Sequence, residues 1–125
     1  MQAFLLIDLS EKATYEQPVL AWVRQQFPGI PTFDLDARSD EMLQQYALRL
    51  LQETAETVVC VKAGEGNLNQ LMPLLEELLQ PNPQRQLLLL GEQPRLLRML
   101  QARSAVRYSL LASEAELQDY LLSLA

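Results

Sequence analysis

The sequence predicts an α/β sandwich in which a five-stranded parallel sheet lies between two layers of helices. Three observations lead to this prediction. Segments with strand character alternate with amphipathic helical segments five times along the chain. The segments at 4–7, 57–61 and 86–90 are almost continuously apolar, which is typical of strands covered on both faces. When strands and helices alternate strictly, each helix serves as the crossover between two parallel strands, and such crossovers are right-handed.

Length and composition are those of one globular domain, which we expect to span residues 1–125. The chain has 125 residues, of which 49% are hydrophobic and 21% charged, so it can bury a stable hydrophobic core without disulfide bonds. No apolar run approaches the roughly 20 residues that cross a bilayer. The first strand is expected to start at residue 3 or 4 with no basic segment or cleavage site before it, so we expect no secretory signal. We therefore expect a cytoplasmic protein without a membrane segment.

The first half of the chain begins with the strand at 4–7, which runs into Asp8 and a polar loop. A helix is expected from Tyr15 to Phe27, with a proline in its first turn. The segment 31–36 alternates polar and apolar residues and begins with proline, which is typical of an edge strand. Ser39 is the expected N-cap of the next helix. The predicted buried stripe of that helix is Met42, Leu43, Tyr46, Ala47, Leu50 and Leu51.

The second half repeats the pattern three times. The strand at 57–61 leads through the loop 62–67 into a helix, and 81–83 is a turn before the strand at 86–90. A short helix follows Pro94, and the strand expected at 106–111 alternates. A capping box at 113–116 starts the last helix. The predicted stripe of the helix after the third strand is Leu68, Leu71, Met72, Leu75, Leu78 and Leu79.

Strand character also predicts the strand order. The first, third and fourth strands are apolar and should be internal, whereas the alternating second and fifth strands should form the edges. The order 2-1-3-4-5, which is flavodoxin-like, meets this condition. The alternative 3-2-1-4-5 would expose the apolar third strand at an edge. Right-handed crossovers then place the first and last helices on one face and the other three on the opposite face.

In this order the topological switch lies between the first and third strands, where ligands of open α/β sheets bind. We expect a small-molecule crevice there, with Asp8 and Lys62 as opposed charges. The structural alternative is that Asp8 caps the first helix or accepts from loop amides while Lys62 pairs with it. The candidate crevice residues are Asp8, Ser10, Lys12, Asp36, Lys62, Gly64, Gly66 and Asn67.

The segment Gly64-Glu65-Gly66 resembles part of a dinucleotide-binding loop, but its context differs. The third glycine position holds Asn69, and the loop follows the third strand rather than the first. Glu65 would also repel a pyrophosphate at a helix N-terminus. The glycines are then expected to permit the turn, and Asn67 to cap the following helix.

The composition excludes several kinds of chemistry. The chain has no histidine and one cysteine, so His-containing zinc sites, Ser-His-Asp triads and a disulfide within the chain are ruled out. We expect Cys60, inside an apolar strand, to be an inert core residue. The net charge of −6 disfavours binding to nucleic acid. We assign no catalytic residue, metal site or cofactor.

Known families with this layout can be compared by their motifs. Response-regulator receivers place an acceptor aspartate where Lys62 stands, and flavodoxins need a phosphate loop where 9–15 has no glycine. The layout is similar to TIR domains and nucleoside deoxyribosyltransferases, which carry a catalytic glutamate on the helix after the third strand. Leu75-Glu76-Glu77-Leu78 falls near that place, without the usual accompanying aromatic and serine residues.

Two functions therefore remain open. The first is a non-catalytic α/β domain that acts by protein interaction or by binding a small ligand. The alternative is a small enzyme acting on a nucleotide or sugar-like ligand at the crevice between the first and third strands. Apolar residues outside the predicted stripes favour the first, because exposed apolar surface marks interfaces. These residues are Leu48, Leu74, Met99 and Leu122.

The charge distribution indicates where a partner would bind. Residues 1–80 carry 12 acidic and 5 basic side chains, whereas 81–125 carry 4 acidic and 5 basic side chains, all arginines. Two copies would repel least through the later half. We expect a homodimer through the fourth helix, fifth strand and fifth helix. Its candidate interface residues are Arg95, Met99, Arg103, Arg107 and Tyr108.

Overall fold

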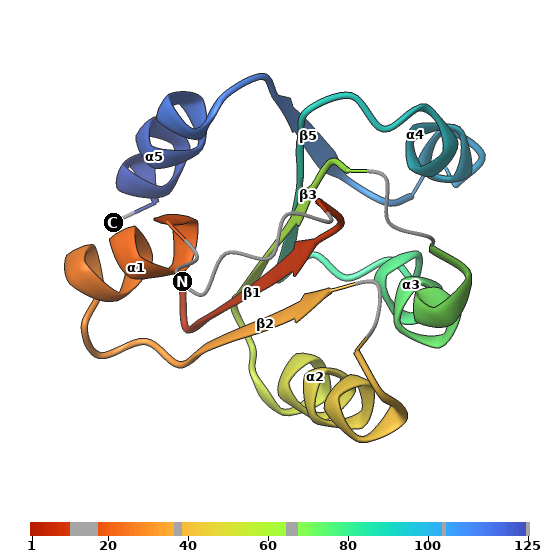
Figure 1. Ribbon diagram of the computed structural model, residues 1–125, viewed down its shortest axis with the longest axis horizontal. Coiled ribbons are helices and arrows are strands. Elements are labelled where there is room, and N and C mark those ends of the chain that lie inside the picture. Colours follow the sequence, from red (N-terminus) through yellow and green to blue (C-terminus); the bar gives the residue numbers. More distant parts are fainter. Residues whose placement is uncertain (11–17, 37–38, 65–67, 104, 125) are drawn as a thin grey trace.

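The computed structural model describes residues 1–10, 18–36, 39–64, 68–103 and 105–124, and it shows a five-stranded, all-parallel sheet (Figure 1). The predicted order 2-1-3-4-5 is confirmed, with the two alternating strands at the edges. The fifth strand is shorter than expected because it begins at Tyr108. In spatial order the strands are β2 (Thr32–Asp36), β1 (Ala3–Asp8), β3 (Thr57–Lys62), β4 (Arg85–Leu90) and β5 (Tyr108–Leu111).

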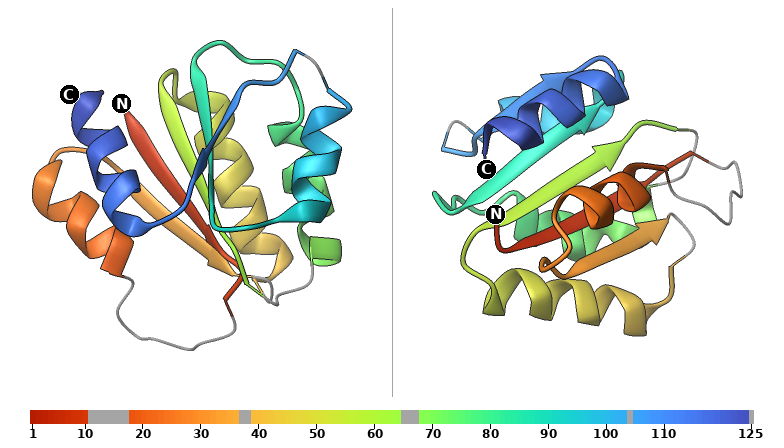
Figure 2. Two further views of the ribbon diagram at one scale, coloured as in Figure 1. Left: turned by 90° about the horizontal axis from the view of Figure 1, so that it is seen from above. Right: turned by 90° about the vertical axis from the view of Figure 1, so that its left-hand side faces the viewer.

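Helices cover both faces of the sheet, as Figure 2 shows in its left view. On one face lie α1 (Pro18–Gln26) and α5 (Glu114–Ser123). On the other lie α2 (Glu41–Glu53), the 3-10 turn η1 (Leu68–Leu71) with α3 (Met72–Leu78), and α4 (Pro94–Gln101). The predicted assignment of helices to faces is confirmed. Residues 15–17, expected to begin the first helix, lie outside the described residues.

The internal strands separate two hydrophobic clusters because successive side chains of a strand point to opposite faces. Leu5 and Ile7 of β1 join the cluster under α2, α3 and α4. Phe4 and Leu6 of the same strand join the cluster under α1 and α5. All six residues of β1 are buried, so this strand has no solvent face.

The predicted stripe of α2 is wrong in part. The helix buries Gln44, Ala47 and Leu51, while Met42 and Tyr46 are exposed. Ala47 is fully buried in the core cluster beneath this helix. Apolar residues occur around much of this helix, so periodicity alone did not determine which of them face the core.

Two further local expectations are corrected. Asp40, not Ser39, is the N-cap of α2, because its carboxylate accepts from Leu43 N at 2.9 Å. The Ser39 hydroxyl closes the preceding turn by accepting from Asp36 N at 2.9 Å. Leu74, expected outside the stripe, is fully buried. The 3-10 turn η1 has about three residues per turn, which shifts the helical phase before α3 begins.

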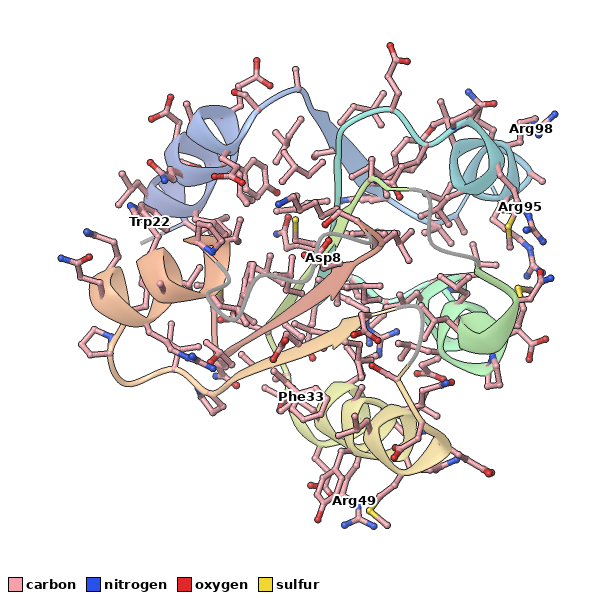
Figure 3. All side chains as sticks on the ribbon, in the orientation of Figure 1. Asp8, Trp22, Phe33, Arg49, Arg95 and Arg98 are labelled. Carbon is pink, nitrogen blue, oxygen red and sulfur yellow. The ribbon has the colours of Figure 1, made fainter. Side chains whose placement is uncertain are left out.

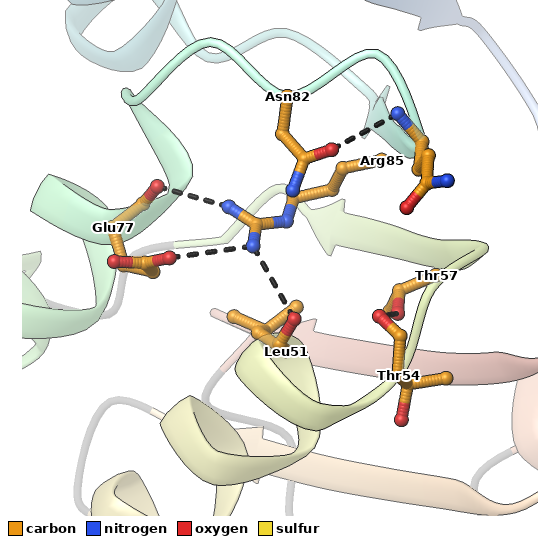
Figure 4. A network of polar contacts seen from close by, with 7 residues as sticks. Leu51, Thr54, Thr57, Glu77, Asn82 and Arg85 are labelled. Atoms are coloured by element: carbon orange, nitrogen blue, oxygen red, sulfur yellow. Dashed lines mark hydrogen bonds and ion pairs between the residues drawn. The ribbon is translucent and has the colours of Figure 1, made fainter.

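Arg85, the first residue of β4, connects three elements at the amino edge of the sheet (Figure 4). Its side chain is only 6% exposed. The guanidinium donates to Glu77 O at 3.0 Å and to Leu51 O at 3.4 Å, and it lies 3.3 Å from the Glu77 carboxylate. Leu51 O belongs to the last turn of α2, where carbonyls lack intrahelical partners. Arg85 therefore joins the ends of α2 and α3 to the sheet.

Replacing Arg85 should destabilise the fold more than replacing an exposed arginine. We expect Arg85→Ala to lower the free energy of unfolding by about 2 to 4 kcal/mol, because buried carbonyls and a carboxylate lose their donor. Arg49→Ala, on the exposed side of α2, should change it by less than about 0.5 kcal/mol. Urea unfolding followed by circular dichroism measures both. Equal losses would show that the Arg85 network contributes little.

Candidate functional site

Charged side chains occupy neighbouring positions at the carboxyl ends of three strands. Asp8 pairs in register with Asp36 on β2 and with Lys62 on β3. Since in-register residues of parallel strands point to the same side, all three face the α1/α5 side of the sheet. The sheet thus brings together the expected residues Asp8, Asp36 and Lys62 at the topological switch. Lys12, Gly66 and Asn67 lie outside the described residues.

Asp8 is held by its own loop. Asp8 is only 4% exposed and lies near the centre of the structure in Figure 3. One carboxylate oxygen accepts from Ser10 N at 2.9 Å and from the Ser10 hydroxyl at 2.5 Å. This contact with a loop amide is the one that the structural alternative predicts. Asp8 thereby stabilises the turn that leaves β1.

Lys62 does not pair with Asp8, although an ion pair between these two residues was the structural alternative to a ligand site. Its Nζ lies 3.6 Å from Oε1 of Glu114, in the first turn of α5. The carboxylate of Asp8 is directed to Ser10, while the long lysine side chain reaches the start of α5. Sequence reasoning assigned Glu114 only to a capping box. The sole sequence signal for its second role was its place just after β5, at the carboxyl edge.

Gly64 lies directly against the loop that follows β1. A β-carbon at this position would lie 2.1 Å from Leu9 O and 2.2 Å from Ser10 N. Leu9 N also donates to Lys62 O at 3.0 Å, which extends the contact between the two chain segments beyond the strands. The two loops therefore touch at the point where a crevice would begin. Glycine is required here because the two backbone segments approach each other closely.

The electrostatics of this edge do not suit an anionic ligand. Among the described residues of this edge, Asp8, Asp36 and Glu114 contribute three carboxylates, against one ammonium from Lys62. A phosphate would meet net negative charge there. Among the described residues, no three side chains of histidine, cysteine, aspartate or glutamate are grouped as metal ligands. Asp36 itself is exposed and takes part in the turn with Ser39.

Cys60 lies beneath these charges and is fully buried. Burial raises the pKa of its thiol from 9.0 to about 12, although the nearby Lys62 opposes the change. Above pH 9 the unfolded chain therefore ionises this thiol while the folded chain keeps it protonated. The contribution of this thiol to the free energy of unfolding is fully present below pH 9 and is lost as the pH rises toward 12.

A hollow of about 480 Å³ lies at the opposite edge of the sheet, at the amino ends of β4 and β5. Its lining includes Leu87, Val106, Arg107 and Tyr108. Glu77, one of the two adjacent glutamates considered for the alternative enzyme, is also at this edge, because it contacts Arg85. Neither feature adjoins the crevice between β1 and β3.

The candidate interface residues fall into two groups. Met99 and Tyr108 are half-buried and pack against the core, so Met99 is not outside the core as expected. Arg95 donates to Asn69 at 3.1 Å. Arg103 and Arg107 are exposed. In Figure 3, Arg95 and Arg98 extend from the outer side of α4.

Comparison with models of known protein families gives no match, and neither does comparison with curated proteins or with solved structures. In the part of the chain that the structure describes, none of the helices has the length and apolar character required to cross a membrane.

Adding a methyl group at Gly64 should force the two loops apart. We expect Gly64→Ala to lower the free energy of unfolding by about 1 to 3 kcal/mol through steric conflict with backbone atoms. Gly29→Ala is the matched control, because nothing lies within 4 Å of a β-carbon at that position. Thermal and urea unfolding measure the difference. A Gly64→Ala protein as stable as Gly29→Ala would contradict the close approach.

Native Cys60 should react slowly with a thiol reagent. At pH 8 we expect labelling at least about 100-fold slower than in denaturant, because the thiol is buried and remains protonated. Absorbance of the released chromophore follows the reaction, with the denatured protein as reference. Rapid labelling of the folded protein would show that β3 is accessible.

Proposed function

We propose that this chain is a flavodoxin-like, non-catalytic interaction domain of the cytoplasm that pairs with a second copy of itself through β5. The observation that carries this proposal is the exposure of Leu110, which is 60% exposed on an edge strand. A large apolar side chain beside edge backbone groups favours pairing with another chain.

The two edges of the sheet differ in their protection against such pairing. β2 follows Pro31 and carries the exposed Asp34 and Asp36, and both proline and charge discourage strand addition. β5 reads Tyr-Ser-Leu-Leu and contains neither. Self-association is therefore favoured at β5.

A two-fold axis beside β5 would pair the strand with its own copy in antiparallel orientation. The same surface then serves both partners, as in most dimers. This arrangement would bring α4 and α5 of both copies to the interface, with Arg103 and Arg107 at its rim. Leu122 on α5 is 49% exposed and adds apolar surface to that helix. The near-neutral charge of residues 81–125 keeps repulsion low.

The carboxyl edge supports the non-catalytic part of the proposal. Asp8 accepts from Ser10, and Lys62 pairs with Glu114, so both candidate groups already have partners within the chain. Glu77 lies at the amino edge beside Arg85. These contacts favour structural roles over the alternative of an enzyme acting on a nucleotide or sugar-like ligand.

Replacing Leu110 with lysine should dissociate the dimer without unfolding the chain. We expect the wild type to have a dimer mass at high micromolar concentration and Leu110→Lys to have a monomer mass, because a charge blocks the strand edge. Met42→Lys is the matched control, since Met42 is 69% exposed on a distant helix. Sedimentation equilibrium measures all three. A monomeric wild type, or a dimer that Leu110→Lys leaves intact, would refute β5 pairing.

A further inference from the structure

The outward side of α2 carries a concentration of exposed apolar side chains. Met42 is 69% exposed, Tyr46 57% and Leu43 40%. These are three of the five large apolar residues that are exposed in the described part of the chain, and all lie in the first two turns of one helix. Their spacing of three and four residues makes them neighbours on the helix surface.

This surface is directed away from the protein core. The residues that α2 buries are Gln44, Ala47 and Leu51. At about 100° per residue, Met42 and Tyr46 lie nearly opposite that buried side. Arg49 occupies the same outward side, and Figure 3 shows it extending away from the sheet. The helix thus has an apolar surface that no other described element covers.

Carboxylates lie at both ends of this surface. Asp40 and Glu41 flank its amino end and Glu53 its carboxyl end, and all three residues are exposed. Glu56 lies beyond the helix, where its carboxylate is 3.7 Å from the N-terminal ammonium of Met1. Arg49 is the one base between residues 39 and 56. The segment therefore combines an apolar centre with acidic ends. We call Met42, Leu43 and Tyr46, with the acids Asp40, Glu41 and Glu53, the α2 surface.

We propose that the α2 surface binds a basic amphipathic helix of a partner protein. The partner would present apolar side chains to Met42 and Tyr46, and lysines or arginines to the acids at either end. Methionine and tyrosine suit such a role, since methionine adapts its shape and tyrosine offers a large amphipathic contact. With 13 residues, α2 is about 20 Å long, which matches a partner helix of about three to four turns.

Charge distinguishes this partner from other occupants of the α2 surface. A second copy would bring a surface with the same three carboxylates of Asp40, Glu41 and Glu53 against the single base Arg49, an excess of two negative charges, and the two would repel. Anionic membranes and nucleic acids would be repelled for the same reason. This proposal concerns a surface separate from the β5 edge and does not depend on the dimer.

Two synthetic peptides of about 14 residues test the proposal. One places leucines at helical i, i+3, i+4 and i+7 spacing with lysines elsewhere, and the other has glutamate in place of lysine. We expect the lysine peptide to bind at least about tenfold more tightly, with amide shifts concentrated in α2. Titration calorimetry and heteronuclear NMR spectra give the affinity and the site.

Variants separate the apolar and the electrostatic contributions. The double variant Met42→Ser, Tyr46→Ser should weaken lysine-peptide binding by at least about tenfold. Glu41→Lys with Glu53→Lys should weaken the lysine peptide and strengthen the glutamate peptide. Leu110→Lys should leave peptide binding unchanged, so failure of the β5 dimer would not affect this test.

Several results would overturn the proposal. They are no binding of the lysine peptide, equal binding of the two peptides, or unchanged binding by the serine double variant. Loss of peptide binding in Leu110→Lys would place the peptide at the β5 edge instead. Dissociation of a dimer by Met42→Lys would show that a second copy occupies the α2 surface.

Discussion

β1 is buried on both faces, and the arrangement of the other elements follows from that constraint. All six of its residues are buried, so it needs a strand on each side and helices above and below. β3 shares this character, and the two pair over their whole length. A parallel pair needs long crossovers, which the helices provide while they cover the faces. The strands that alternate polar and apolar residues are consequently left at the edges.

The same constraint shapes the carboxyl edge. Asp8 ends a buried strand, so its carboxylate needs hydrogen-bond donors within the chain. It accepts two hydrogen bonds from Ser10. The loop after β3 approaches so closely that only Gly64 fits against Leu9. Lys62 then turns to Glu114 and connects the centre of the sheet to α5. At this position, where α/β folds often hold ligands, the described side chains of Asp8 and Lys62 contact other residues of the same chain.

The proposals about function depend on exposed side chains outside this edge. Domains of this architecture host many activities, so an assignment must rest on particular residues rather than on the fold. Leu110 on β5 and Met42 with Tyr46 on α2 are large apolar side chains that the fold leaves exposed. They lie on elements at opposite ends of the sheet, next to different charges. We propose that one domain thereby presents an edge that pairs with a second copy and a separate surface that binds a basic partner.

The sequence by itself determined the elements, the strand order and the helices on each face. It also placed Asp8, Asp36 and Lys62 at one edge. These inferences depend on continuous or alternating apolar runs, which reflect local burial. Only the tertiary structure decided that Met42 and Tyr46 face outward, that Leu74 faces inward, and that Lys62 pairs with Glu114. Helical phase and long-range ion pairs depend on how closely elements approach each other, and that distance is set by packing rather than by any local pattern.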